Sequence, residues 1–154
     1  MHRLDVGERA PGFSLFDHDG HRTSLDDVLG QRVVLYFYPA DDTPGCTKEA
    51  CQFNDALSSF GAAGATVIGI SPDDATRHAN FRRTYGLGFT LLSDPERSVM
   101  TQYGAFGEKM LYGKRVLGVI RSTFIVGPTG TIERAWYNVR ADGHAAKVLA
   151  VLES

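Results

Sequence analysis

The chain has 154 residues, of which 43% are hydrophobic and 22% are charged, and its formal net charge is -2. This length suffices for one domain with its own hydrophobic core, so we expect a single domain spanning residues 1–154. The small net charge predicts neither nucleic-acid binding nor a basic patch for a membrane surface. No apolar run approaches the ~20 residues of a membrane span and residues 1–11 lack a signal-peptide core, so we expect a cytoplasmic protein.

The first half of the chain predicts a hairpin followed by alternating strands and helices. Residues 13–16 alternate in polarity and lead through the turn signal Asp19-Gly20 to residues 22–24, which predicts an N-terminal β-hairpin. The continuous apolar run 33–38 is typical of a strand that is covered on both faces. The other elements expected in this half are a helical turn at 25–28, a helix over 44–60, a strand at 66–70, a helix opened by 72–74 and continuing to 85, and a strand at 89–92.

The second half predicts a brief helix, a loop, two strands and a closing helix. The helix begins near Asp94 and runs toward Tyr103, and the glycine-punctuated, partly basic segment 104–118 is interpreted as a loop. The remaining elements are strands at 122–126 and 131–136 and a helix over 142–152. This order predicts an α/β fold of the thioredoxin-like kind, with a mixed central sheet and helices on both faces.

Both cysteines lie in one short segment, residues 43–51, directly after the apolar run. Thr43 suits the N-cap of a helix and Pro44 suits its first position, so Cys46 is expected in the first helical turn. Helix N-termini stabilise anions, thiolates included, and this placement therefore predicts a reactive thiol. Cys51 taken alone is also compatible with a small buried apolar residue.

The spacing of the two cysteines restricts what they can do together. In an unbroken helix, α-carbons five residues apart are about 8.7 Å from each other, which exceeds the roughly 7 Å that a disulfide allows. A disulfide between Cys46 and Cys51 therefore requires the first turns of the helix to unwind. A zinc site would need a second pair of ligands, and the close pair His18 and His21 is interpreted as two solvated turn residues, so we expect no metal.

The charges around Cys46 conflict with a reactive thiolate. Asp41, Asp42 and Glu49 are close in sequence and disfavour a negative charge on the sulfur, while Lys48 offsets them only in part. The helix end contributes less than a full positive charge. A reactive thiolate therefore requires a cation from elsewhere in the chain.

The segment 39–46 reads P-x-x-x-T-x-x-C, which resembles the active-site signature of peroxiredoxins. The similarity extends over roughly residues 6–152 and is closest to one branch, peroxiredoxin Q or bacterioferritin comigratory protein. The segments that carry the resemblance are 36–51, 69–73, 91–95, 112–114 and 121–124. It implies a thioredoxin-like fold and a peroxidase acting on hydrogen peroxide and organic hydroperoxides without a cofactor.

The resemblance also implies roles for individual residues. Cys46 would be the peroxidatic cysteine, and Thr43 would hydrogen-bond the peroxide through its hydroxyl group. Pro39 would shield the thiolate from water. Arg121, an arginine at the head of an apolar strand, would be the missing cation.

Two further roles and the expected partners come from the same resemblance. Cys51 matches the helical resolving cysteine that many members of this branch carry, and Glu49 occupies the position of an acidic residue that orients the arginine. The implied partners are a hydroperoxide and thioredoxin or a similar dithiol, and we expect a monomer or a weak dimer. Two alternatives stay open: a thiol–disulfide oxidoreductase, although such proteins usually carry C-x-x-C, and a redox-switched binding module.

Overall fold

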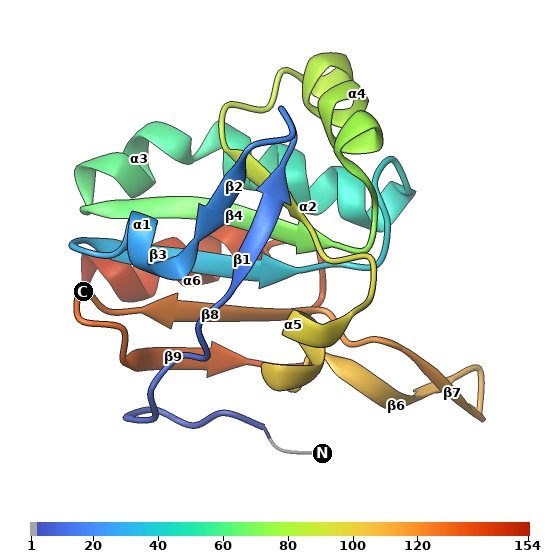
Figure 1. Ribbon diagram of the computed structural model, residues 1–154. Helices are drawn as coiled ribbons and strands as arrows, with labels where there is room; N and C mark the ends of the chain where they lie inside the picture. The colour runs from blue at the N-terminus through green and yellow to red at the C-terminus, as the bar shows by residue number, and fades with distance from the viewer. Residues whose placement is uncertain (1–2) are drawn as a thin grey trace.

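The structure, a computed structural model, describes residues 3–154, so residues 1–2 of the expected domain lie outside the described part. Its centre is a seven-stranded mixed sheet (Figure 1). The strands of this sheet are β1 (Ser14–Asp17), β2 (Arg22–Ser24), β3 (Arg32–Phe37), β4 (Ala65–Ser71), β5 (Thr90–Ser93), β8 (Ser122–Val126) and β9 (Ile132–Trp136). Across the sheet they lie in the order β2-β1-β5-β4-β3-β8-β9, which includes the predicted N-terminal hairpin β1–β2.

Strand β3 lies inside the sheet and is buried on both faces. It pairs in parallel with β4 and antiparallel with β8, and residues 33–37 have no exposed surface. The continuous apolar run of the sequence predicted this double coverage, and the prediction is confirmed.

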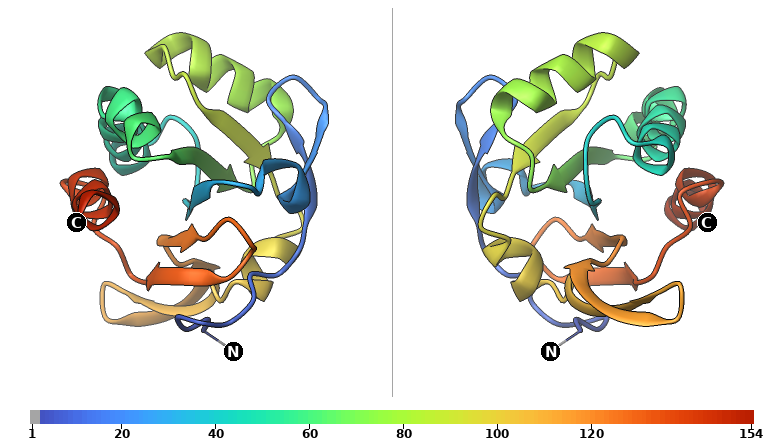
Figure 2. Two further views of the ribbon diagram at one scale, coloured as in Figure 1. Left: turned by 90° about the vertical axis from the view of Figure 1, so that its left-hand side faces the viewer. Right: turned by 90° about the vertical axis from the view of Figure 1, so that its right-hand side faces the viewer.

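Helices cover both faces of the sheet, as expected. They are α1 (Leu25–Val28), α2 (Pro44–Asp55), α3 (Leu57–Ala62), α4 (Ala75–Tyr85), α5 (Ser98–Gln102) and α6 (His144–Glu153). Helices α2, α3 and α6 pack on one face together with Phe81 of α4, whereas α1 and α5 pack on the other (Figure 2). None of the helices within residues 3–154 has the length and apolar character that crossing a bilayer would need.

Two predictions about segments require correction. The helix expected over 44–60 is divided at Ala56 (φ -96°, ψ 6°) into α2 and α3. The segment 104–118, interpreted as a loop, forms instead a two-stranded hairpin of β6 (Phe106–Leu111) and β7 (Lys114–Val119), which extends from the body of the molecule (Figure 1).

The hairpin was missed because it does not bury one face in the core. Met110 and Leu117 are 64% and 69% exposed, so the sequence has no reason to alternate between apolar and polar residues. The turn is made by Tyr112 and Gly113, whose φ angles are +52° and +77°. Two successive positive φ angles are typical of the tight turns that match strand twist in a hairpin.

Candidate active site

Cys46 lies in the first turn of α2, where the chain leaves the C-terminal end of β3. Thr43 is the N-cap and Pro44 the first helical residue, as the sequence predicted. The thiol is free and only 2% exposed, and its residue packs in the apolar cluster that includes Ala50 and Phe53. The helix therefore presents a buried sulfur at its electropositive end.

Thr43 makes a contact that its N-cap position did not predict. Its side chain forms no capping bond to α2, and its hydroxyl group donates to the carbonyl oxygen of Ala40 at 3.0 Å. The first bond of the helix runs instead between backbones, from Thr47 N–H to the carbonyl oxygen of Thr43 at 2.8 Å. The hydroxyl of Thr43 thus braces the loop that precedes α2.

The cation that the sequence called for is Arg121. In the antiparallel pairing of β3 with β8, Phe37 lies opposite Ser122, so the start of β8 meets the end of β3 where α2 begins. Arg121, one residue before β8, donates from Nη2 to Sγ of Cys46 at 3.2 Å. A contact between residues 75 positions apart thus supplies the positive charge at the thiol.

Glu49 holds the other end of the guanidinium. It lies one helical turn after Cys46 and has no exposed surface, and its Oε1 accepts from Nη1 of Arg121 at 2.5 Å. Burial raises the pKa of Glu49 to about 7, against the opposing effect of Arg121. Burial would lower the pKa of Arg121, but the charges of Glu49 and Cys46 outweigh it and raise that pKa. The guanidinium therefore stays charged and bridges the carboxyl group and the sulfur.

The raised pKa of Glu49 makes stability depend on pH. Its folded-state pKa of about 7 exceeds the ordinary 4.5, so this group's contribution is fully present below pH 4.5 and is lost as the pH rises through 7. Relative to Glu49→Gln, the wild type is expected to lose on the order of 3 kcal/mol of unfolding free energy over this window. Urea unfolding of both proteins at pH 5 and pH 8 measures this difference. The same change in unfolding free energy between these pH values in both proteins would contradict the raised pKa of Glu49.

Cys51 shares the unbroken helix α2 with Cys46, and it is free and half-buried. Burial, with a smaller effect of Asp55, raises the pKa of its thiol. The next residue, Gln52, ties α2 to the segment before α6: its Nε2 donates to Asp142 Oδ1 at 2.7 Å and its Oε1 accepts from Gly143 N–H at 2.8 Å. Unwinding of α2 through this turn would therefore have to break the two bonds of Gln52.

The sequence also singled out Pro39, His18 and His21, and the structure gives their exposure. Pro39 is exposed, and its shielding role stays a prediction. His21 is exposed as expected, but the side chain of His18 is only 10% exposed, so its interpretation as a solvated residue is wrong. Within residues 3–154, two groups of carboxylates and a histidine are close enough for a metal ion, and neither includes a cysteine: Asp17, Asp19 and His21, and Asp41, Asp73 and His78.

Gln52 and His78 carried no recognisable signal in the sequence. Both act through side-chain bonds to residues far along the chain, His78 to Asp41 and Gln52 to Asp142. The positions of these partners depend on how the elements pack, which a local pattern does not contain.

The fold and the site together define a class of protein. A seven-stranded mixed sheet with a buried thiol at the start of the helix that follows an interior strand, β3, is the thioredoxin-like arrangement used for thiol chemistry. An arginine directed at that sulfur can stabilise negative charge both on the thiolate and on an oxygen that approaches it. These features indicate a thiol-dependent enzyme.

Comparison with known proteins identifies the family. Residues 6–135 match the AhpC/TSA family. A relative from Mycobacterium tuberculosis is 57% identical over 95% of this chain and 93% of its own length, and peroxiredoxin Bcp of Bacillus subtilis is 37% identical over 97% and 96%. A solved structure of the Xanthomonas campestris bacterioferritin comigratory protein has 41% identity and a TM-score of 0.86, covering 92% of this chain and 90% of that one. The chain therefore belongs to the AhpC/TSA peroxiredoxin family, in its Bcp/PrxQ branch, and is a thiol peroxidase.

Proposed function

We propose that this chain reduces hydrogen peroxide and organic hydroperoxides with Cys46 as the peroxidatic cysteine. The observation that carries the proposal is the 3.2 Å contact between Arg121 Nη2 and Cys46 Sγ, which aims a cation at the only buried cysteine among residues 3–154. The alkyl peroxide reduction activity described for the Xanthomonas campestris relative supports the substrate class.

In the first step the Cys46 thiolate attacks the terminal oxygen of the hydroperoxide. The S–O bond forms as the O–O bond breaks, and the leaving oxygen takes a proton to become water or an alcohol. The donors for the reacting oxygens are the Cys46 backbone N–H and the Arg121 guanidinium, which Glu49 orients. The Thr43 hydroxyl, whose proton is donated to Ala40, would bond the peroxide by accepting from its O–H group. Pro39 would limit the approach of water. Cys46 is left as a sulfenic acid.

In the second step Cys51 condenses with the sulfenic acid, forming a disulfide and releasing water. The first turns of α2 must unwind for this, which breaks the bonds that Gln52 makes to Asp142 and Gly143. Thioredoxin or a similar dithiol then reduces the disulfide by thiol–disulfide exchange. We place this cycle in the cytoplasm, where such dithiols keep thiols reduced.

The pairing of the two cysteines can be tested by mass spectrometry after one equivalent of peroxide. The wild type is expected to show a Cys46–Cys51 disulfide within one chain, because Cys51 is the nearest thiol along the helix. Cys51→Ser is expected to stop at the sulfenic acid and to lose multiple turnover with a dithiol. A stable sulfenic acid or an intermolecular disulfide in the wild type would remove Cys51 from the cycle. An insulin-reduction assay run alongside separates peroxidase activity from general thiol–disulfide exchange.

A further inference from the structure

The loop that carries the thiol site into α2 has a strained backbone. Asp42, directly before Thr43, has a φ of +58°, a left-handed conformation that residues other than glycine adopt only when neighbouring contacts hold them. The question is which contacts hold this loop, because Thr43 and Cys46 follow it immediately.

Asp41 is the buried anchor of the loop. It is 3% exposed, and its carboxylate accepts from the hydroxyl of Tyr38 at 2.5 Å through Oδ1 and lies 2.6 Å from Nδ1 of His78 through Oδ2. Its backbone N–H donates to Asp73 Oδ2 at 2.7 Å. Bonds to buried charged groups are among the more costly to leave unmade.

His78 fixes Asp41 from helix α4, and its own ring is held on both sides. The ring has no exposed surface, and Nε2 lies 3.0 Å from the carbonyl oxygen of Leu92. Because a carbonyl oxygen only accepts, Nε2 carries a proton and donates it there. The Asp41 carboxyl and Nδ1 of His78 then share one further proton between them across 2.6 Å.

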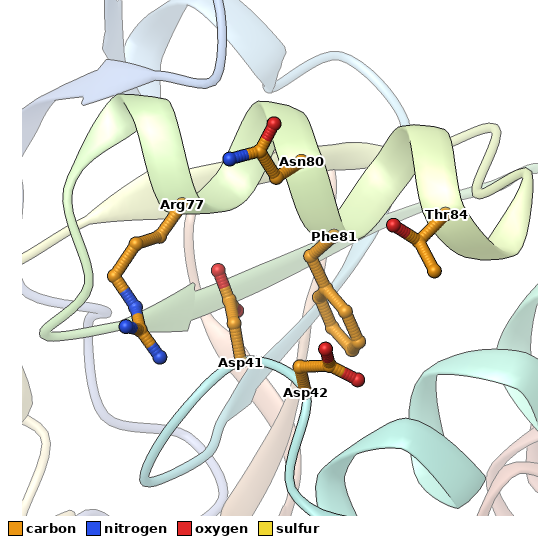
Figure 3. A pocket seen from close by; sticks show the side chains of 6 residues that line it. All are labelled: Asp41, Asp42, Arg77, Asn80, Phe81 and Thr84. Atoms are coloured by element: carbon orange, nitrogen blue, oxygen red, sulfur yellow. The ribbon is translucent and has the colours of Figure 1, made fainter.

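Tyr85, seven residues after His78 on α4, holds the strained residue itself. Its hydroxyl donates to Asp42 Oδ1 at 2.5 Å, and seven residues correspond to two helical turns, so both contacts come from one face of α4. Figure 3 shows the side chain of Asp41 pointing from the loop toward this helix, with Asp42 beside it below Phe81. A surface pocket of about 190 Å³ is lined by Asp41, Asp42 and residues of α4, so the two carboxylates are not closely packed against the helix on this side.

We propose that His78, together with Tyr85 at the surface, is a positioning residue for the peroxide step: by holding Asp41 and Asp42 from α4, it sets the loop that presents Thr43 and Cys46 to Arg121. This inference rests on the proposed role of Cys46. Its physical basis is preorganisation, since a misplacement of about 1 Å at a reacting group can cost up to a hundredfold in rate. Neither side chain touches the sulfur, so both act through the loop.

A matched pair of substitutions separates positioning from stability. Asparagine places its amide near the position of Nδ1, so His78→Asn can keep the bond to Asp41 and loses the bond to Leu92. Glutamine reaches the position of Nε2, so His78→Gln can keep the bond to the Leu92 carbonyl oxygen and loses the bond to Asp41. Each variant gives up one buried bond, and His78→Gln is expected to have the lower urea midpoint because it leaves the buried Asp41 carboxylate without this partner. The two variants are therefore compared without urea, at a temperature where both are fully folded. The rate of Cys46 oxidation, followed by rapid alkylation and mass spectrometry, is expected to be about tenfold lower in His78→Gln than in His78→Asn.

Equal oxidation rates in the two variants, measured where both are fully folded, would overturn the proposal. Tyr85→Phe, at an exposed position, tests it even where neither His78 variant folds. This change is expected to slow Cys46 oxidation about threefold and to leave reduction of the oxidised protein by a dithiol unchanged. The matched control is Tyr112→Phe on the β6–β7 hairpin, where the tyrosine is 95% exposed. An oxidation rate in Tyr85→Phe equal to that of the control would contradict the role of α4.

The activity of Cys46→Ser distinguishes failure of the proposed function from failure of the positioning role of His78 and Tyr85. Retained peroxide consumption in Cys46→Ser would overturn the proposed function. An inactive Cys46→Ser beside variants of His78 and Tyr85 that react at the wild-type rate would overturn the positioning role alone.

Discussion

Cys46→Ser is expected to abolish peroxide consumption, because a serine hydroxyl at neutral pH is neither ionised nor able to attack the O–O bond. The buried site should accept the exchange, since sulfur and oxygen differ little in the space they need and Arg121 can still donate to the new hydroxyl. Steady-state assays with a dithiol reductant, using hydrogen peroxide and one organic hydroperoxide in turn, measure the effect. The expected rate is that of the assay mixture without protein.

The control for this variant is Cys51→Ser, the same substitution five residues further along α2. It is expected to consume one equivalent of peroxide and then stop, since its only missing step is formation of the disulfide. Turnover that persists in Cys46→Ser would overturn the proposed function, and a first equivalent that is lost in Cys51→Ser would show that Cys51 is needed for the attack on the peroxide.

Arg121→Gln is expected to lower the second-order rate constant for peroxide by roughly a hundredfold to a thousandfold, the range found when one preorganised donor is removed from a charge-stabilising site. The reason is the contact of Nη2 with Cys46 Sγ at 3.2 Å, which puts a full positive charge where the thiolate and the transition state are negative. Single-turnover oxidation, measured over a series of peroxide concentrations, gives this rate constant directly.

Arg121→Gln also affects stability through Glu49, and a double variant separates this effect from the effect on the rate. Removing Arg121 leaves a buried carboxyl group without its 2.5 Å partner, which destabilises the fold by itself. Arg121→Gln/Glu49→Gln removes that carboxyl group and is expected to recover stability in urea without recovering the rate. Recovery of the rate in the double variant would show that the arginine serves the fold rather than the reaction. Arg121→Lys keeps the positive charge but cannot bond the sulfur and the carboxyl group at the same time through a planar guanidinium. Its rate constant is therefore expected to lie between those of the wild type and Arg121→Gln.

Much of the fold was predictable because its core elements carry strong local patterns. The run 33–38 is apolar without interruption because β3 is covered on both faces. Helix α4 begins after Asp74, whose side chain caps it, and ends at Gly86 in the left-handed conformation, so both signals are residues with a local mechanism. The β6–β7 hairpin was missed for the complementary reason, since it projects into solvent and leaves no core-facing alternation in its sequence.

The sequence by itself determined the local chemistry of the site. A threonine and a proline ahead of Cys46 place the thiol in a first helical turn, and the acidic neighbours show that a distant cation is needed. The sequence also showed that a disulfide between Cys46 and Cys51 requires the helix to unwind. Helix geometry alone places α-carbons five residues apart too far from each other for that bond.

Only the tertiary structure decided which groups complete the site. The pairing of β3 with β8 brings Arg121 to the thiol, and the packing of α4 brings His78 to Asp41, 37 positions earlier in the chain. An isolated arginine before a strand or a histidine within a helix has many possible partners. The choice among them is made by strand register and helix packing, which are global properties that sum the burial of many apolar residues and leave no trace next to the residues they bring together.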